Sequence, residues 1–162
     1  MKTPVSTLAL LAIAACALLA ADKPATPSRT LAEYKFGAAL SGDAVASDQL
    51  VGKAVLIDSW GIHCGPCLGL LPEIEKTSRR YKDKLVVVGA HMQSGTDAEI
   101  MDVVKKNKLS YPIVKGYSGP ISGNGLPHVH VFDATGAMLF EGSPFDKDYE
   151  KMLRRAIASV KK

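Results

Sequence analysis

Two cysteines separated by two residues, Cys64 and Cys67, are the side chains of this sequence best suited to chemistry. They lie between an apolar, strand-like segment at 54–59 and a helix-like segment at 68–81. Two thiols at the start of a helix can close as a disulfide or open as a dithiol, and the free N–H groups and positive dipole end of the helix favour a thiolate. Because the thiolate is the reactive form, we expect Cys64, nearer the exposed tip, to attack and Cys67, one turn deeper, to resolve.

Two other interpretations of such a pair are disfavoured. Structural zinc needs four ligands, usually including a second pair of cysteines or histidines. The sequence has no second C-x-x-C and no following histidine pair at the spacing of a zinc site, so we expect no metal at the motif. A purely structural disulfide is also disfavoured, because closing so short a ring stabilises little. The pair is therefore interpreted as redox-active.

Length and composition restrict the possible classes of protein. The chain has 162 residues, which supports one domain with a sizeable core. The formal net charge is +4, but the basic residues are scattered along the sequence. Binding to nucleic acid would need a clustered basic face, so nucleic acid is not an expected partner.

The N-terminus predicts export. Lys2 precedes a short apolar run with small residues near its end, so residues 1–21 are interpreted as a secretory signal. Three outcomes stay open: lipidation at Cys16 as in bacterial lipoproteins, ordinary signal cleavage near Cys16, and an uncleaved anchor. The polar, proline-containing stretch 22–30 is expected to be a linker, and 31–162 the folded domain. An exported domain would meet an oxidising compartment, and it would touch a membrane only through its N-terminal anchor or lipid.

The hydrophobic pattern predicts an α/β domain. Apolar runs at 54–57 and 85–88 are typical of buried strands, and Thr96 to Glu99 has the capping-box pattern that opens a helix to about residue 107. Weaker strands are expected within 31–40 and at 111–114. A hairpin at 129–132 and 137–140 precedes a final amphipathic helix at 146–160. This order predicts a central mixed sheet flanked by helices on both faces.

At this point the chain resembles thioredoxin-fold proteins, and more closely the TlpA/ResA-like exported thiol–disulfide oxidoreductases. The resemblance covers about residues 36–161. Its matching features are Gly52-Lys53 before the first core strand, Trp60 four residues before the first cysteine, Cys64-Gly65-Pro66-Cys67, Pro72 in the first helix and Gly125-Leu126-Pro127 before a strand. The resemblance implies the thioredoxin fold and a protein-disulfide oxidoreductase that needs no cofactor beyond its own Cys64–Cys67 disulfide.

The resemblance also implies a substrate-binding surface. Pro127 matches the cis proline opposite the active site, and X-Pro is the only common site for cis peptides. A cis bond there would turn the Leu126 backbone toward the cysteines, where an extended substrate strand could pair with it. The simpler alternative is a loop proline before a strand. The remaining surface for a substrate is assigned to the motif and its flanks: Trp60, His63, Gly65 and Pro66.

Asp58 matches the buried acid of thioredoxin, six residues before the first cysteine. Burial beneath the disulfide would raise the pKa of this carboxyl toward neutrality, so that it could accept a proton from Cys67. The alternative is a strand-end aspartate that caps a loop. Many TlpA/ResA-like proteins instead carry a glutamate three residues after the second cysteine, where this chain has Leu70. The identity of the residue that accepts the proton from Cys67 therefore stays open.

Histidines provide the remaining candidate residues. Thioredoxins usually have tryptophan where this chain has His63, and a cationic imidazole there would favour a Cys64 thiolate and a more oxidising couple. An exposed rim residue with little effect is the alternative. His91, His128 and His130 lie at a strand end or alternate along a strand, a pattern that can ligate metal but is common by chance.

The resulting hypothesis is an exported protein-disulfide reductase in the periplasm or on the outer face of the cytoplasmic membrane. Its partners would be disulfide-containing exported clients, apocytochrome c among them, and a membrane thiol-electron donor. Two alternatives stay open. One is a Sco-like copper chaperone that uses Cys64, Cys67 and a histidine. The other is a redox-inert module that only binds clients.

Overall fold

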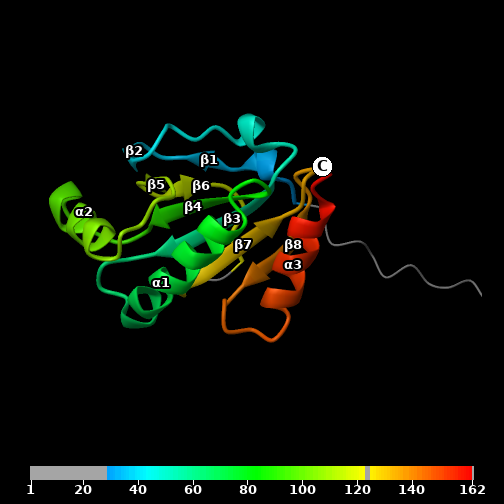
Figure 1. Cartoon of the computed structure of the whole chain (residues 1–162). Helices are drawn as coiled ribbons and strands as arrows, with labels where there is room; N and C mark the ends of the chain where they lie inside the picture. Colours follow the sequence, from blue (N-terminus) through cyan, green and yellow to red (C-terminus); the bar gives the residue numbers. More distant parts are fainter. Residues whose placement is uncertain (1–28, 123–124, 162) are drawn as a thin grey trace, which may run out of the picture.

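The computed structural model describes residues 29–122 and 125–161 (Figure 1). The expected signal at 1–21, with Cys16, and most of the expected linker lie outside the described residues. In chain order the elements are η1 (Leu31–Glu33), β1 (Lys35–Phe36), β2 (Ala39–Ser41), η2 (Ser47–Leu50), β3 (Ala54–Trp60), α1 (Gly65–Arg80), β4 (Leu85–His91), α2 (Asp97–Lys106), β5 (Ile113–Val114), β6 (Tyr117–Ser118), β7 (His128–Phe132), β8 (Met138–Gly142) and α3 (Tyr149–Ser159), where η marks a 3-10 helix.

Six strands form the main sheet, in the order β2-β5-β4-β3-β7-β8. β3, β4 and β5 run parallel to one another, whereas β2, β7 and β8 pair antiparallel with their neighbours. The sheet is therefore mixed, as the element order predicts. β3 lies between β4 and β7 and is buried along all seven residues. Such a strand is apolar on both faces, which explains why Ala54 to Ile57 shows no alternation.

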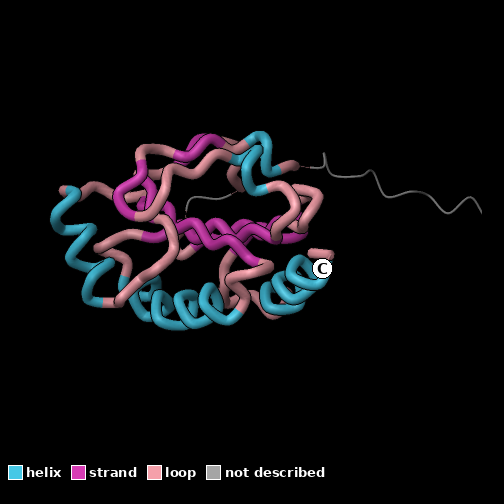
Figure 2. The backbone as a smooth tube through the Cα atoms, turned by 45° about the horizontal axis from the view of Figure 1, so that its top comes forward, coloured by secondary structure: helices cyan, strands magenta, loops and turns pink. Residues whose placement is uncertain are grey.

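The two faces of the sheet are covered differently (Figure 2). The three α-helices contribute to one core cluster, represented by Leu71, Ile100 and Leu153. A second cluster includes Leu31 of η1 and Leu50 of η2. Helices were expected on both faces, but the second cluster is built with 3-10 turns in place of an α-helix. These turns have three and four residues, too few to repay the cost of starting an α-helix.

Several local predictions are confirmed. The Thr96 hydroxyl accepts a hydrogen bond from the Glu99 N–H, and the Glu99 carboxylate accepts one from the Thr96 N–H, so α2 begins with the predicted capping box. The hairpin of β7 and β8 is present, and its turn has Gly136 at φ +83°. The strand expected within 31–40 is instead divided among η1, β1 and β2.

The beginning of the described chain contacts the domain. Arg29 forms an ion pair with Glu141 of β8, and Thr30 forms a bridge with Ala137. These two residues were expected to belong to the linker, and their contacts place them with the domain. No helix in the described part of the chain is long and apolar enough to cross a membrane.

Candidate active site

The cysteine pair lies where the central strand passes into the first helix. β3 ends at Trp60, and Cys64 is the N-cap of α1, which begins at Gly65. Pro66 occupies the first turn, where its missing N–H costs nothing. Cys64 and Cys67 form a disulfide, and the Cys67 N–H donates to Cys64 Sγ at 3.2 Å. In the reduced protein, a Cys64 thiolate would receive the same N–H and the positive end of the helix dipole.

The two sulfurs differ in access. Cys64 is 8% exposed and lines a cavity, whereas Cys67 is 1% exposed and packs in the core cluster that includes Leu71. A client disulfide can therefore approach Cys64 more readily than Cys67. This arrangement agrees with the predicted roles of attacking and resolving thiol.

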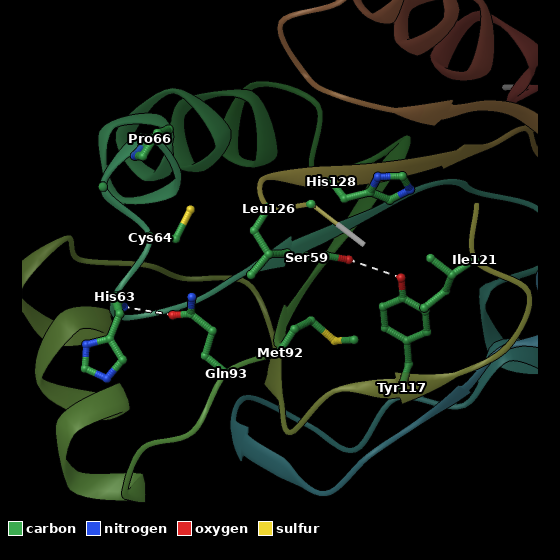
Figure 3. A pocket seen from close by; sticks show the side chains of 12 residues that line it. Ser59, His63, Cys64, Pro66, Met92, Gln93, Tyr117, Ile121, Leu126 and His128 are labelled. Atoms are coloured by element: carbon green, nitrogen blue, oxygen red, sulfur yellow. Dashed lines mark hydrogen bonds between the residues drawn. The ribbon is translucent and has the colours of Figure 1, made fainter. Parts of the chain in front are cut away.

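The cavity beside Cys64 has a volume of about 690 Å³ (Figure 3). Four residues predicted to meet a substrate line it: His63, Gly65, Pro66 and Leu126. The lining also includes residues that the sequence did not identify for this role: Ser59, Met92, Gln93, Tyr117, Ile121, Gly125 and His128. The additional residues come from the ends of β3, β4 and β7 and from the segment around β6, so only the fold brings them beside the motif.

Two of the predicted substrate-binding residues lie outside the cavity lining. The Leu126–Pro127 peptide bond is cis, as the resemblance implied, and Pro127 directly follows Leu126, which lines the cavity. Trp60 is fully buried and packs with Cys67 in the core cluster, so it offers no surface to a substrate. Side chains alternate along a strand, which points Trp60 to the same face as Leu56.

Asp58 is the buried acid of the site. It is 2% exposed and lies on the face of β3 that also carries Leu56 and Trp60, which belong to the same core cluster as Cys67. Asp58 Oδ2 has no hydrogen-bond partner among the described residues. Burial raises the pKa of Asp58 from 3.8 to about 7. A carboxyl with a pKa near neutrality can both accept and release a proton at physiological pH.

A tyrosine shares this buried environment. Burial raises the pKa of Tyr111 above its ordinary value, and the charge of Asp58 raises it further. Gly89 pairs with Asp58 across β3 and β4. A Cβ on Gly89 would lie 2.9 Å from Tyr111 Cε2 and 3.3 Å from Trp60 Nε1, so a larger residue could not occupy this position without displacing its neighbours. The absence of a side chain at Gly89 makes room for the aromatic rings beside the acid.

The end of β4 holds the loop before Cys64. His91 Nε2 accepts a hydrogen bond from the Ile62 N–H at 3.2 Å, and Gln93 Oε1 accepts one from the His63 N–H at 2.9 Å. Burial lowers the pKa of His91, and the charge of His63 lowers it further. A neutral His91 can accept this bond. The sequence identified His91 only as a possible metal ligand.

His63 itself is exposed, and Figure 3 shows its ring pointing away from the Cys64 sulfur. Its backbone N–H, held by Gln93, fixes the loop at this residue. In this orientation the His63 ring does not contact the Cys64 sulfur. The effect on Cys64 that the sequence predicted would therefore be a through-space electrostatic one.

A group of polar side chains around Tyr117 borders the cavity. Tyr117 Oη lies 3.2 Å from Ser59 Oγ and 3.4 Å from His130 Nδ1. His128 and His130 both lie near Glu141 Oε1. Burial and then the charge of His128 lower the pKa of His130 to about 4, so this imidazole is neutral at pH 7. The sequence identified both histidines by their alternation but gave no signal for Glu141.

No family model matches the chain, but comparison with known proteins found several thiol-disulfide oxidoreductases among its relatives. Thiol-disulfide oxidoreductase YkuV of Bacillus subtilis is 28% identical over 132 residues, which cover 75% of this chain and 88% of YkuV. Thiol-disulfide oxidoreductase ResA of Halalkalibacterium halodurans is 32% identical over 75 residues, 46% of this chain and 43% of ResA. The solution structure of a thioredoxin-like protein in the oxidized form matches with a TM-score of 0.67 and 28% identity, over 83% of this chain and 98% of that one.

These likenesses agree with the geometry of the site. The mixed sheet and three α-helices of this chain superpose on the matched structure, and the cysteine pair lies at the start of α1. The chain is therefore a thioredoxin-fold thiol–disulfide oxidoreductase, related to YkuV and ResA.

Proposed function

We propose that this protein is exported and reduces disulfides in client proteins by thiol–disulfide exchange. The observation that carries the proposal is the asymmetry of the cysteine pair. Cys64 lines a cavity at the N-terminus of a helix, and Cys67 lies buried behind it. A couple built in this way can attack with one sulfur and release the product with the other.

The exchange proceeds in two displacements. The Cys64 thiolate attacks one sulfur of the client disulfide, the client S–S bond breaks, and the leaving client thiolate takes a proton from water. The Cys67 thiol then gives its proton to the Asp58 carboxylate and attacks Cys64 Sγ. The mixed disulfide breaks, and the client leaves with its second thiolate. Two electrons pass from the dithiol to the client, and the Cys64–Cys67 disulfide forms.

The lining of the cavity supports the binding of an extended client segment. Gly125 and Leu126 line it together with Pro66, which lies at the start of α1 (Figure 3). A client strand that pairs with the Leu126 backbone would bring its disulfide toward Cys64, and main-chain hydrogen bonds would hold clients of different sequence.

The direction of transfer is inferred from the motif. The Gly65-Pro66 interior is the thioredoxin type, and such couples lie near −270 mV, against about −120 mV for a strong oxidant. The reductant would be a membrane thiol-electron donor, because a protein outside the cytosol cannot draw on the cytosolic pool. The signal-like residues 1–21 support export, and the resemblance supports apocytochrome c as one client.

Trapping of the mixed disulfide tests the proposal. A Cys67→Ser variant produced in its own cells should accumulate as a disulfide-linked adduct with exported proteins, because the resolving thiol is absent. Such an adduct migrates slowly on a non-reducing gel and disappears with dithiothreitol. The matched control is Cys64→Ser, which lacks the more accessible nucleophile and should trap little. Equal trapping by both variants, or none by either, would contradict the proposed roles.

The two other hypotheses are less well supported. A copper chaperone would gather Cys64, Cys67 and a histidine around one ion. In the described structure, the histidines with metal-binding geometry are His128 and His130, and their third partner is Glu141. A redox-inert module would keep its client binding after alkylation of Cys64, whereas the proposed exchange would be abolished.

A further inference from the structure

A cluster of three side chains lies beside the cavity that contains Cys64. His128 and His130 alternate along β7 and so point to the same face, and Glu141 pairs with His130 across β7 and β8. His128 Nε2 lies 3.5 Å from Glu141 Oε1, and His130 Nε2 lies 3.4 Å from the same oxygen. One ligand atom from each residue lies within 4.8 Å of the other two.

These distances do not fit hydrogen bonds well. An N–H···O hydrogen bond is usually 2.7–3.2 Å long. His130 is fully buried and His128 is 8% exposed, yet the Nε2 atoms of both are without a hydrogen-bond partner among the described residues. A buried imidazole nitrogen with no partner costs free energy, and an ion is one recognised way to satisfy it.

The same distances do fit a shared metal ion. Zinc binds histidine nitrogen and carboxylate oxygen at about 2.0–2.2 Å, and the ligands of a tetrahedral ion at that distance lie about 3.4 Å apart. Both distances from Glu141 Oε1 are close to this value. Two histidines and a glutamate also form one of the ligand sets that bind zinc while leaving a fourth position open.

Neighbouring groups orient the ligands for such an ion. His130 Nδ1 lies 3.4 Å from Tyr117 Oη, which in turn lies 3.2 Å from Ser59 Oγ. With its proton on Nδ1 and directed to Tyr117, His130 presents the lone pair of Nε2 to Glu141, and a cation between them would remove their repulsion. Arg29 pairs with Glu141 Oε2, and the Ser122 N–H donates to Oε1, so the carboxylate is held in place.

We propose that His128 Nε2, His130 Nε2 and Glu141 Oε1 bind a divalent cation of the zinc class. His128 also lines the cavity, and Figure 3 shows it with Ser59 and Tyr117 at one side of that space, so the proposed ion would lie next to the cavity. This site uses neither cysteine and does not depend on the proposed reductase activity.

The test is metal binding by the purified, oxidised protein, in which Cys64 and Cys67 are held in the disulfide and cannot bind metal. Titration with Zn²⁺ should show one bound ion per chain by calorimetry. Titration with Co²⁺ should give the strong visible absorption of a four-coordinate ion. Glu141→Gln and His128→Ala should each weaken binding by more than about tenfold, since even changes outside the ligands of a metal site cost that much. His63→Ala, an exposed histidine lining the same cavity, should bind as the wild type does.

Glu141→Gln is the informative variant because it preserves side-chain size, and circular dichroism shows whether it folds. Zn²⁺ should raise the Tm of the oxidised wild type and leave that of folded Glu141→Gln nearly unchanged. The proposal would be overturned if the oxidised wild type binds no ion. It would also be overturned if Glu141→Gln and His128→Ala bind with wild-type affinity, or if binding appears only after reduction of the cysteines.

Discussion

Replacing Asp58 with asparagine should remove a pH-dependent loss of stability from the oxidised protein. Asp58 is 2% exposed, and burial raises its pKa from 3.8 to about 7. Below pH 3.8 the carboxyl is protonated in both the folded and the unfolded state and has no effect. As the pH rises, the unfolded chain releases the proton first, so folding becomes less favourable until the pH exceeds about 7.

The magnitude follows from the two pKa values. The interval from 3.8 to about 7 spans roughly three pH units, and each unit corresponds to about 1.4 kcal/mol, so the loss approaches about 4 kcal/mol. That is a large fraction of the free energy of unfolding of an ordinary domain. Asparagine cannot ionise, so the variant lacks this loss.

The assay is urea unfolding of the oxidised wild type and Asp58→Asn at pH 4 and pH 8. The difference in free energy of unfolding, variant minus wild type, should be more favourable at pH 8 than at pH 4 by up to about 4 kcal/mol. Comparing two pH values cancels any constant cost of packing the asparagine. A difference that stays the same at both pH values would refute the burial of a titrating carboxyl at Asp58.

Two further changes test the packing around the site. Gly89→Ala should destabilise the protein by about 1–3 kcal/mol in urea unfolding, because its Cβ would lie 2.6 Å from a neighbouring side chain. Gly69→Ala, in α1 with open space around it, should be neutral or stabilising, and equal losses in both variants would contradict the packing argument. His91→Phe should lose about 1–3 kcal/mol at pH 8, since the Ile62 N–H loses its acceptor. Because burial lowers the pKa of His91, the wild type should also lose stability as the pH falls below 6.5, and the variant should lack that part of the loss.

Local patterns predicted much of the fold. The capping box at Thr96 and Glu99 fixes the start of α2 through bonds between near neighbours, so it can be read without any tertiary information. The position of the cysteines between a buried strand and a helix likewise follows from short-range patterns. Residues 29–50 were harder to predict, because β1 and β2 exist only through pairing with β6 and β5, far along the chain.

Less of the site could be predicted, because several of its contacts depend on how neighbouring strands align. Glu141 meets His130 only because β8 pairs with β7 in one alignment, and a bulge near Phe132 makes that alignment unreadable from the hairpin turn. Trp60 was assigned to the surface by resemblance, although alternation along the strand from Leu56 already pointed it inward. His91 acts on the loop through a parallel partner strand, which no local pattern reveals.

The reduction potential of the Cys64–Cys67 couple tests the central claim most directly. The purified protein would be equilibrated with glutathione or dithiothreitol buffers, and the fraction of disulfide measured by thiol alkylation and mass spectrometry. A reductase built on this motif should give a potential near about −270 mV. A potential near about −120 mV would contradict the account, because such a couple would donate disulfides to its clients instead of reducing them.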